Sequence, residues 1–424
     1  MAHVLSTKKN MRSNESQGVL RKERQLSVTL PLWAIVFTWA GTLLALATTP
    51  ADVVPEGALV EPALWQAGGL LAVPVGAAVR RWQRIFRVEN LLMVGLVFWL
   101  LLDMIQGAYP LDGLARADVS NVFLAIGLMA TGVWGGTLLR PWALPRVVRR
   151  SASIPFRPDQ AFLLILLFFA LGIIKFLAAT GFDPLVALAY LDAPRFSAPW
   201  SRGVMGGWGA FLDHMAYFGY VLPTLTVLLA HYVGWRNWRV WTGICLSVII
   251  VLFLAQGGGR RVIGVTVGAA VVTWFLLQPR LQFGKAVGGV LVVAALLWGM
   301  QIMLEYRGTG FDDLSIEKIT ETKRGHFHVD DNFYRLGQMI QLVPEEYPYV
   351  YEQQFYYIIV RPIPRVFWPG KPVSPGYNLS QMVGVEGASL SASVVSEFYV
   401  AWGWFMIFVG GYLYGRLASM WNQV

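Results

Sequence analysis

The stretch QAFLLILLFFALGIIKFLAA, residues 160–179, decides the fold of this chain. It is apolar apart from Gln160 and Lys175. Its length is the roughly 20 residues that a helix needs to cross the hydrocarbon core of a bilayer. Similar stretches occupy 30–49, 63–79, 90–106, 119–139, 210–233, 239–256, 262–278, 285–304 and 397–417. We therefore predict an all-α polytopic membrane protein with about ten transmembrane helices.

The composition of all 424 residues supports this class. Hydrophobic residues make up 56% of the chain and charged residues only 14%, whereas a soluble domain carries about 25% charged residues. These values exclude a water-soluble enzyme and a disordered protein. The lone cysteine, Cys245, excludes a disulfide framework and a cysteine-based metal site.

The charges predict the orientation in the membrane. The basic tail 1–29 is too long and polar for a cleaved signal peptide, so we place it in the cytoplasm. If successive loops lie on alternating sides of the membrane, most of the 34 basic residues lie inside and most of the 25 acidic residues lie outside. The positive-inside rule requires this distribution. Helices one to nine then lie in 30–304, a large outer loop in 305–396, and the last helix with a short cytoplasmic tail in 397–424. Because the basic surplus is spread over short inner loops, nucleic acid is excluded as a partner.

The large outer loop is polar, rich in proline and too aromatic for a disordered segment. Apolar residues recur at helical spacing in 331–343, which predicts a short helix lying on the membrane or on the protein. An aromatic run in 347–357 is either an interfacial belt or a wall on which sugar rings stack. On the second interpretation, three residues contact sugar: Tyr356, Tyr357 and Trp368.

Two outer stretches combine basic residues with backbone constraints. In QGGGRR, 256–261, two arginines oppose the orientation rule and three glycines allow a close backbone approach. Arg260 and Arg261 are either snorkelling side chains or a phosphate site. In RPIPRVFWPGKP, 361–372, prolines fix the backbone around Arg361, Arg365 and Lys371, which suits phosphate binding. Two further outer arginines are assigned supporting roles: Arg195 and Arg335.

Two outer carboxylates are candidates for the catalytic base or for orienting a hydroxyl. Glu397 leads the last span, and Asp331 follows His326 and His328. The two histidines lack a further ligand set at a recognised spacing, so we expect neither a metal nor a cofactor. Cations, aromatic rings and carboxylates on the outer side together suit a sugar carried on a polyprenyl diphosphate. The cations would stabilise the departing diphosphate, and a base would accept the hydroxyl proton.

Several of these motifs resemble the oligosaccharide repeat-unit polymerases, also called O-antigen polymerases or Wzy-type proteins. The resemblance rests on Gly259-Arg260, on Arg361-Pro-Ile-Pro-Arg365 followed by Trp368-Pro-Gly-Lys371-Pro372, and on Ser396-Glu397-Phe-Tyr399. It implies a GT-C-like glycosyltransferase of the bacterial inner membrane. Such an enzyme joins undecaprenyl-diphosphate-linked repeat units at the periplasmic face of the membrane. Its expected partners include this lipid-linked substrate and membrane lipid. A chain-length regulator and a flippase are the partner proteins that the resemblance implies.

Two other functions use similar features. An O-antigen ligase, which transfers glycan to another acceptor, needs the same arginines. A transporter or flippase of lipid-linked sugars is typically built from paired repeats with broken helices at the midplane. The sequence has no evident internal repeat, and its unusual charges gather on one side, which favours an enzyme.

Overall fold

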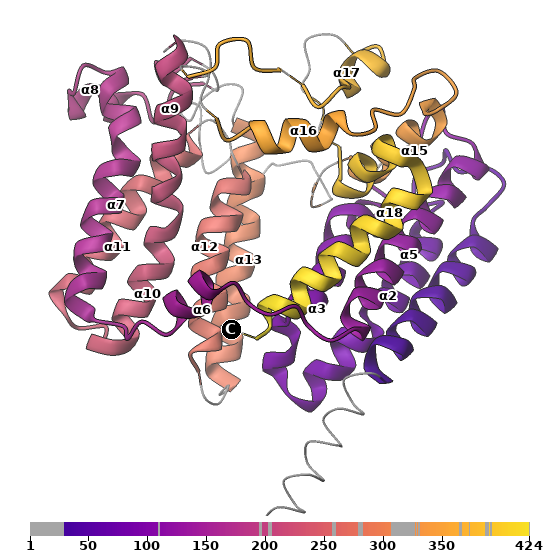
Figure 1. Ribbon diagram of the computed structural model, residues 1–424, viewed down its shortest axis with the longest axis horizontal. Helices are drawn as coiled ribbons and strands as arrows, with labels where there is room; N and C mark the ends of the chain where they lie inside the picture. Colours follow the sequence, from indigo (N-terminus) through magenta and orange to yellow (C-terminus); the bar gives the residue numbers. More distant parts are fainter. Residues whose placement is uncertain are drawn as a thin grey trace, which may run out of the picture. The chain divides into compact units, whose positions relative to one another are not determined.

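The computed structural model describes most of the chain (Figure 1). The described residues are 29–108, 111–194, 197–201, 206–256, 260–278, 283–306, 327, 329, 331–363, 367–372, 374–385, 390 and 392–423. These residues form helices and connecting turns, with no strand among them. The predicted all-α class is confirmed.

All of the predicted spans coincide with helices. Eight helices are long and apolar enough to cross a membrane: Thr29–Thr48, Val60–Arg80, Val88–Ile105, Arg116–Leu138, Pro158–Ala179, Phe211–Val233, Trp238–Ala255 and Val394–Trp421. Two shorter apolar segments, Val262–Leu276 and Val287–Ile302, coincide with the remaining two predicted spans. The chain is thus a multi-pass membrane protein.

In chain order after Thr29–Thr48, the labelled α-helices have the following bounds: α2 Val60–Arg80, α3 Val88–Leu96, α4 Leu102–Ile105, α5 Arg116–Leu138, α6 Arg146–Ala152, α7 Pro158–Ala179, α8 Pro184–Ala189, α9 Gly206–Ala216, α10 Leu222–Val233, α11 Trp238–Ala255, α12 Arg260–Leu276, α13 Phe283–Tyr306, α15 Asn332–Leu342, α16 Gln353–Val360, α17 Leu379–Met382 and α18 Val394–Trp421. A π-helical turn, Val97–Leu101, joins α3 to α4, and the 3-10 turn Tyr217–Val221 joins α9 to α10. The helix predicted in 331–343 is confirmed as α15.

The chain divides into two compact units. Unit 1 comprises Met1–Ser153, His326–Tyr356 and Ser374–Val424, and unit 2 comprises Ile154–Gly325 and Tyr357–Val373. The loop 305–396, predicted to lie on the outer side, is therefore divided between the two units. Each unit has its own buried core.

Unit 1 is built on the close pairing of α5 with α18. A Cβ atom on Gly132 would lie 2.4 Å from the Phe408 carbonyl oxygen, and one on Gly136 would lie 2.3 Å from that of Tyr412. Conversely, a Cβ on Gly415 would lie 2.0 Å from the Val133 carbonyl oxygen. Glycines on both helices thus bring the two backbones into contact, which is how small residues promote helix association in lipid.

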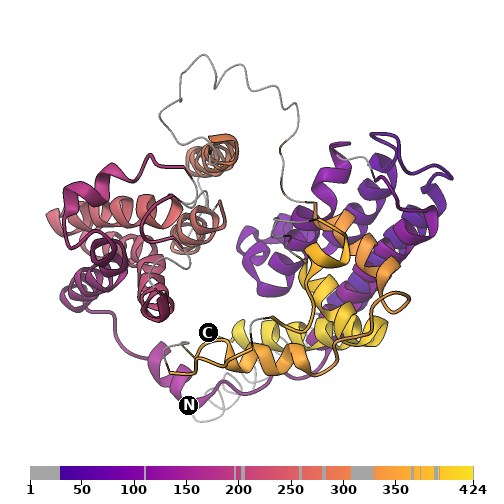
Figure 2. The ribbon, with the colours of Figure 1, turned by 90° about the horizontal axis from the view of Figure 1, so that it is seen from above.

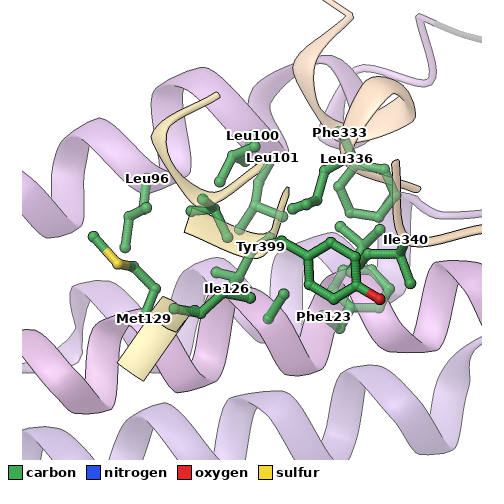
Figure 3. Packing of buried hydrophobic residues seen from close by; sticks show 14 of the residues in the cluster. Leu96, Leu100, Leu101, Phe123, Ile126, Met129, Phe333, Leu336, Ile340 and Tyr399 are labelled. Carbon is green, nitrogen blue, oxygen red and sulfur yellow. The ribbon is translucent and has the colours of Figure 1, made fainter. Parts of the chain in front are cut away.

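Helix α15 belongs to the core of unit 1. Phe333 and Leu336 are at most 1% exposed, and the ring of Phe333 packs against Phe123 of α5 at a centroid distance of 5.3 Å. Figure 3 shows these residues together with Tyr399 of α18. The Tyr399 hydroxyl donates a hydrogen bond of 2.9 Å to the carbonyl of Val343 at the end of α15. Part of the large loop is therefore fixed onto the membrane helices.

Helix α18 is broken near its start. Trp402 and Gly403 have non-helical backbone angles, and the φ of Gly403 is 64°, a value that favours glycine. The amides of Val350 and Tyr351 donate hydrogen bonds of 3.0 and 3.1 Å to the carbonyls of Val400 and Ala401. These bonds satisfy carbonyls that the break deprives of helical partners. The segment that carries Glu397 is thereby separated from the main part of the span.

Unit 2 is a bundle of α7 with α9 to α13, with α8 at one end (Figures 1 and 2). Gly172 of α7 lies close to Gly219, where a Cβ on Gly172 would be 3.1 Å from the Gly219 nitrogen. An aromatic cluster fills the end where α7 and α11 finish. In it, the ring of Trp200 packs against Phe176 and Phe253 at centroid distances of 5.3 and 5.8 Å.

Candidate functional site

The candidate residues fall into both units. Unit 1 contains Glu397, Asp331, Arg335 and Tyr356; unit 2 contains Arg195, Arg260, Arg261, Tyr357, Arg361, Arg365, Trp368 and Lys371. Arg195 and Arg365 lie outside the described residues, and the side chains of Arg260 and Arg261 at the start of α12 do as well. Seven of the eight cationic and sugar-binding residues assigned to unit 2 thus come from just two stretches, which begin at residues 260 and 357.

Gln256 links the segment before Arg195 to the segment before Arg260. Its side chain is 6% exposed and accepts a hydrogen bond of 3.2 Å from the indole nitrogen of Trp200. Its amide nitrogen donates one of 2.9 Å to the carbonyl of Ala193. Along the chain, Arg195 is two residues from Ala193 and Arg260 is four residues from Gln256. The structure therefore joins the segments leading to both arginines through one buried amide.

An ion pair lies at the same end of the bundle. The Lys175 ammonium of α7 is 2.5 Å from the Asp213 carboxylate of α9, with side chains 14% and 37% exposed. Lys175 belongs to a membrane span, where a charged side chain is costly unless it is paired. A lysine within an apolar span is a signal that could have identified Lys175 from the sequence, but only the fold reveals its partner.

Lys371 bonds to the residues at the start of the basic segment 361–371. Its ammonium donates hydrogen bonds of 2.9 Å to the Arg361 carbonyl and 2.7 Å to the Ile363 carbonyl. The rigidity predicted from the prolines thus also has a second source. The Arg361 side chain is exposed, and its guanidinium lies 5.9 Å from the ring centroid of Tyr357. Lys371 therefore positions the start of this segment, and the exposed Arg361 is the better placed of the two for an anion.

Asp331 and Arg335 neutralise each other at the start of α15. Arg335 Nε and Nη2 are each 2.6 Å from one Asp331 oxygen, and Nη1 donates to Gln338 at 2.8 Å. Both side chains of the ion pair are less than one-fifth exposed. Binding a diphosphate through Arg335, or a hydroxyl proton through Asp331, would require this network to open. These contacts indicate that Asp331 and Arg335 stabilise the start of α15.

Glu397 has a different environment. It lies in the first turn of α18, whose N-terminus is capped by the Ser393 hydroxyl, and accepts a hydrogen bond of 3.3 Å from Gln354. Burial and, secondarily, the negative charge of Glu397 raise the pKa of Tyr377. Glu397 is half-buried among amide and phenol groups, an arrangement that can accept or orient a hydroxyl proton. The sequence motif identified Glu397, but neither Gln354 nor Tyr377 could be paired with it without the fold.

The aromatic run is divided between packing and a cavity. Phe355 stacks on Trp402 at the break in α18 with a centroid distance of 5.5 Å. Tyr356 is 49% exposed and Trp368 is half-buried. Tyr347 and Tyr349 line a cavity, whereas the three residues that were assigned to sugar do not line it. The sequence alone did not show which of these rings line the cavity. In the structure α16 begins at Gln353, so the aromatic run is divided between a helix and the segment before it.

The described part of the chain contains no group of three or more His, Cys, Asp or Glu side chains that could hold a metal ion. The histidines considered as ligands, His326 and His328, lie outside that part. Comparison with known proteins leaves the family open: no family model, curated protein or solved structure matches this chain.

Proposed function

We propose that this protein is a membrane glycosyltransferase that polymerises undecaprenyl-diphosphate-linked oligosaccharide repeat units at the periplasmic face of the bacterial inner membrane. The observation that carries the proposal is the buried Gln256 amide, which connects the segment before Arg195 to the segment before Arg260. This link supports the prediction that cations from separate stretches act on one anionic group. A structural membrane subunit would have no need of such a concentration of outer arginines.

The basic residues of unit 2 act on the leaving group in this proposal. Guanidinium groups of Arg260, Arg261, Arg361 and Arg365 bind the diphosphate, with Arg195 in support. Preorganised cations stabilise the negative charge that develops as a phosphate ester leaves. The bond from Lys371 to the Arg361 carbonyl keeps Arg361 in place, so little ordering is needed when the substrate binds.

The transfer itself exchanges one bond at the anomeric carbon of the growing glycan. A hydroxyl oxygen of the incoming repeat unit forms the new glycosidic bond. The bond to the phosphate oxygen breaks, and its electron pair leaves with the undecaprenyl diphosphate. Glu397 accepts the hydroxyl proton. We assign this role to Glu397 rather than to Asp331, because Asp331 is engaged by two nitrogen atoms of Arg335.

The test is a reconstituted reaction. Purified protein in lipid nanodiscs is incubated with a synthetic polyprenyl-diphosphate oligosaccharide, and the products are separated by size. A ladder formed without a second acceptor supports a polymerase. Transfer that occurs only when another acceptor is added indicates a ligase. Movement of intact substrate across vesicle membranes without transfer indicates a transporter.

Matched variants locate the chemistry. Arg260→Ala and Arg365→Ala should abolish the ladder while single lipid-linked units persist. Arg236→Ala, which removes an exposed cation from the opposite loop of unit 2, should leave it unchanged. Polymer of normal length from both outer variants, at equal protein levels, would refute the assignment of the cations.

A further inference from the structure

Unit 1 contains a cavity of about 280 Å³ that the predicted site residues do not line. Its walls come from the segment before α16, the segment around α17, and Val400 of α18. Three tyrosines contribute to the lining: Tyr347, Tyr349 and Tyr377. Three side-chain amides complete the polar part of the wall: Gln353, Asn378 and Gln381.

The amides of this cavity are exposed and accessible to a ligand. The side chains of Gln353, Asn378 and Gln381 bond to no other described residue. Asn378 directly precedes α17, yet its side chain does not cap that helix. By contrast, the neighbouring Gln354 is buried and bonded to Glu397. Each exposed amide offers a carbonyl acceptor and two N–H donors to a ligand.

The lining contains no Asp, Glu, Lys, Arg or His. An anionic group would find no cation there and a metal ion no carboxylate, so the chemistry of the wall selects a neutral polar ligand. Tyrosine rings present flat apolar faces, and amides pair with adjacent hydroxyl groups. A sugar ring, with C–H faces and a rim of hydroxyls, matches both features.

A glycine keeps the cavity open. Gly376 has a φ of 100°, in the left-handed region that favours glycine. A Cβ atom there would lie 2.7 Å from Gln353 Oε1 and 3.2 Å from Val350 Cβ. A larger residue would therefore force Gln353 to move. The volume is just below the range of about 300–1,000 Å³ of sites for drug-sized ligands, which fits a small sugar unit.

A second cavity shows the contrast. It measures about 390 Å³ and lies in unit 2, where Val227, Trp235 and Trp274 contribute to a lining without charged side chains or amides. That wall offers almost no hydrogen-bonding groups. Of these two cavities, only the one in unit 1 combines amide side chains with aromatic rings.

From these observations, we infer that the unit 1 cavity binds a neutral sugar residue of the glycan, held by Asn378 and Gln381 and stacked on Tyr347. The inference deepens the proposed function and rests on it for the origin of the glycan. It replaces Tyr356, Tyr357 and Trp368 as the principal sugar contacts. Hydrogen bonding to an unionised wall makes recognition at this position independent of the diphosphate.

The experiment measures binding without turnover. Methyl glycosides of glucose, galactose, mannose, rhamnose and N-acetylglucosamine are mixed with the full-length protein in nanodiscs, and saturation-transfer NMR detects bound sugar. At least one glycoside should bind, and added pyrophosphate should not displace it. The double variant Asn378→Ala/Gln381→Ala should weaken binding at least about fivefold, because it removes two hydrogen bonds to the sugar.

Two further variants provide a check and a control. Tyr347→Ala removes an exposed stacking face and should also weaken binding. Gln341→Ala removes an exposed amide of α15 outside the cavity and should leave binding unchanged. Absence of binding by every glycoside, or equal binding by wild type, the double variant and Tyr347→Ala, would overturn the inference.

The outcomes separate this inference from the proposed function. Sugar binding that depends on Asn378 and Gln381, combined with normal polymer from Arg260→Ala and Arg365→Ala, would leave the cavity assignment standing and refute the cation scheme. A ladder that requires the arginines, combined with no sugar binding at the cavity, would refute only the cavity assignment.

Discussion

Replacing Gly136 with alanine should destabilise unit 1 although alanine favours helices. A Cβ atom at Gly136 would lie 2.3 Å from the Tyr412 carbonyl oxygen, about 1.1 Å short of the 3.4 Å at which ordinary contact begins. The obstructing atom belongs to the α18 backbone and cannot rotate away. The two helices must therefore separate, and overpacking of this kind costs about 1–3 kcal/mol.

Gly135 is the matched control on the same helix. A Cβ there meets no atom within 4 Å, so Gly135→Ala gains helix propensity of roughly 0.5–1 kcal/mol without a clash. Thermal unfolding of both variants in detergent, followed by circular dichroism, should give a lower midpoint for Gly136→Ala than for wild type. Gly135→Ala should be at least as stable as wild type. Because α18 also carries Glu397, Gly136→Ala should lower the rate of polymer formation as well.

Equal midpoints for the two glycine variants would refute the close pairing of α5 with α18. The double replacement Gly136→Ala/Gly415→Ala tests whether the contact is shared. A single separation of the helices relieves both clashes, so the combined loss should be smaller than the sum of the separate losses. Fully additive losses would show that the two glycines do not meet across one interface.

Three further outcomes follow from the contacts. Gln256→Leu leaves the Trp200 indole and the Ala193 carbonyl unpaired and should cost about 1–3 kcal/mol in thermal unfolding; an unchanged midpoint would contradict the link. Asp213→Asn strands the Lys175 charge and should lower stability by about 1 kcal/mol or more, and adding Lys175→Met should recover most of that loss in a double-mutant cycle. Burial and Glu397 raise the pKa of Tyr377, so its hydroxyl stays protonated below its ordinary pKa of about 10; sugar binding should therefore be constant from about pH 6 to 9, and a tenfold change in that range would contradict an uncharged wall.

The candidate site was only partly accessible from the sequence. Glu397 was identifiable because an acidic residue at the start of an apolar span is costly, and the arginine stretches stood out against the orientation rule. Gln256 and Lys371 illustrate what could not be assigned. Three glycines beside Gln256 predict a close backbone approach to a ligand, and a lysine near two arginines predicts an anion site. In the structure each bonds to carbonyls of the protein itself.

The cavity in unit 1 was invisible for a related reason. Asn378 and Gln381 stand in an unremarkable polar segment, and their distance from Tyr347 along the chain gives no hint of proximity. In the fold they line one cavity together with Val350, whose amide bonds to Val400 at the broken start of α18. Aromatic composition correctly marked the region, but it could not distinguish Phe355, which packs on Trp402, from rings that face the cavity.

The hydrophobic pattern was sufficient to predict an all-α membrane protein and to locate its spans within a few residues, because burial in lipid depends on runs of apolar side chains along the chain. Which helices pair is a different kind of information. The contact of Gly132 and Gly136 with Gly415 and its neighbours depends on two surfaces nearly 280 residues apart in sequence. Likewise, Gln354 donates a hydrogen bond to Glu397, 43 residues further along the chain, because the fold brings α16 to the start of α18. Only packing in three dimensions settles which partner a polar group takes, because protein and ligand compete for the same few donors and acceptors.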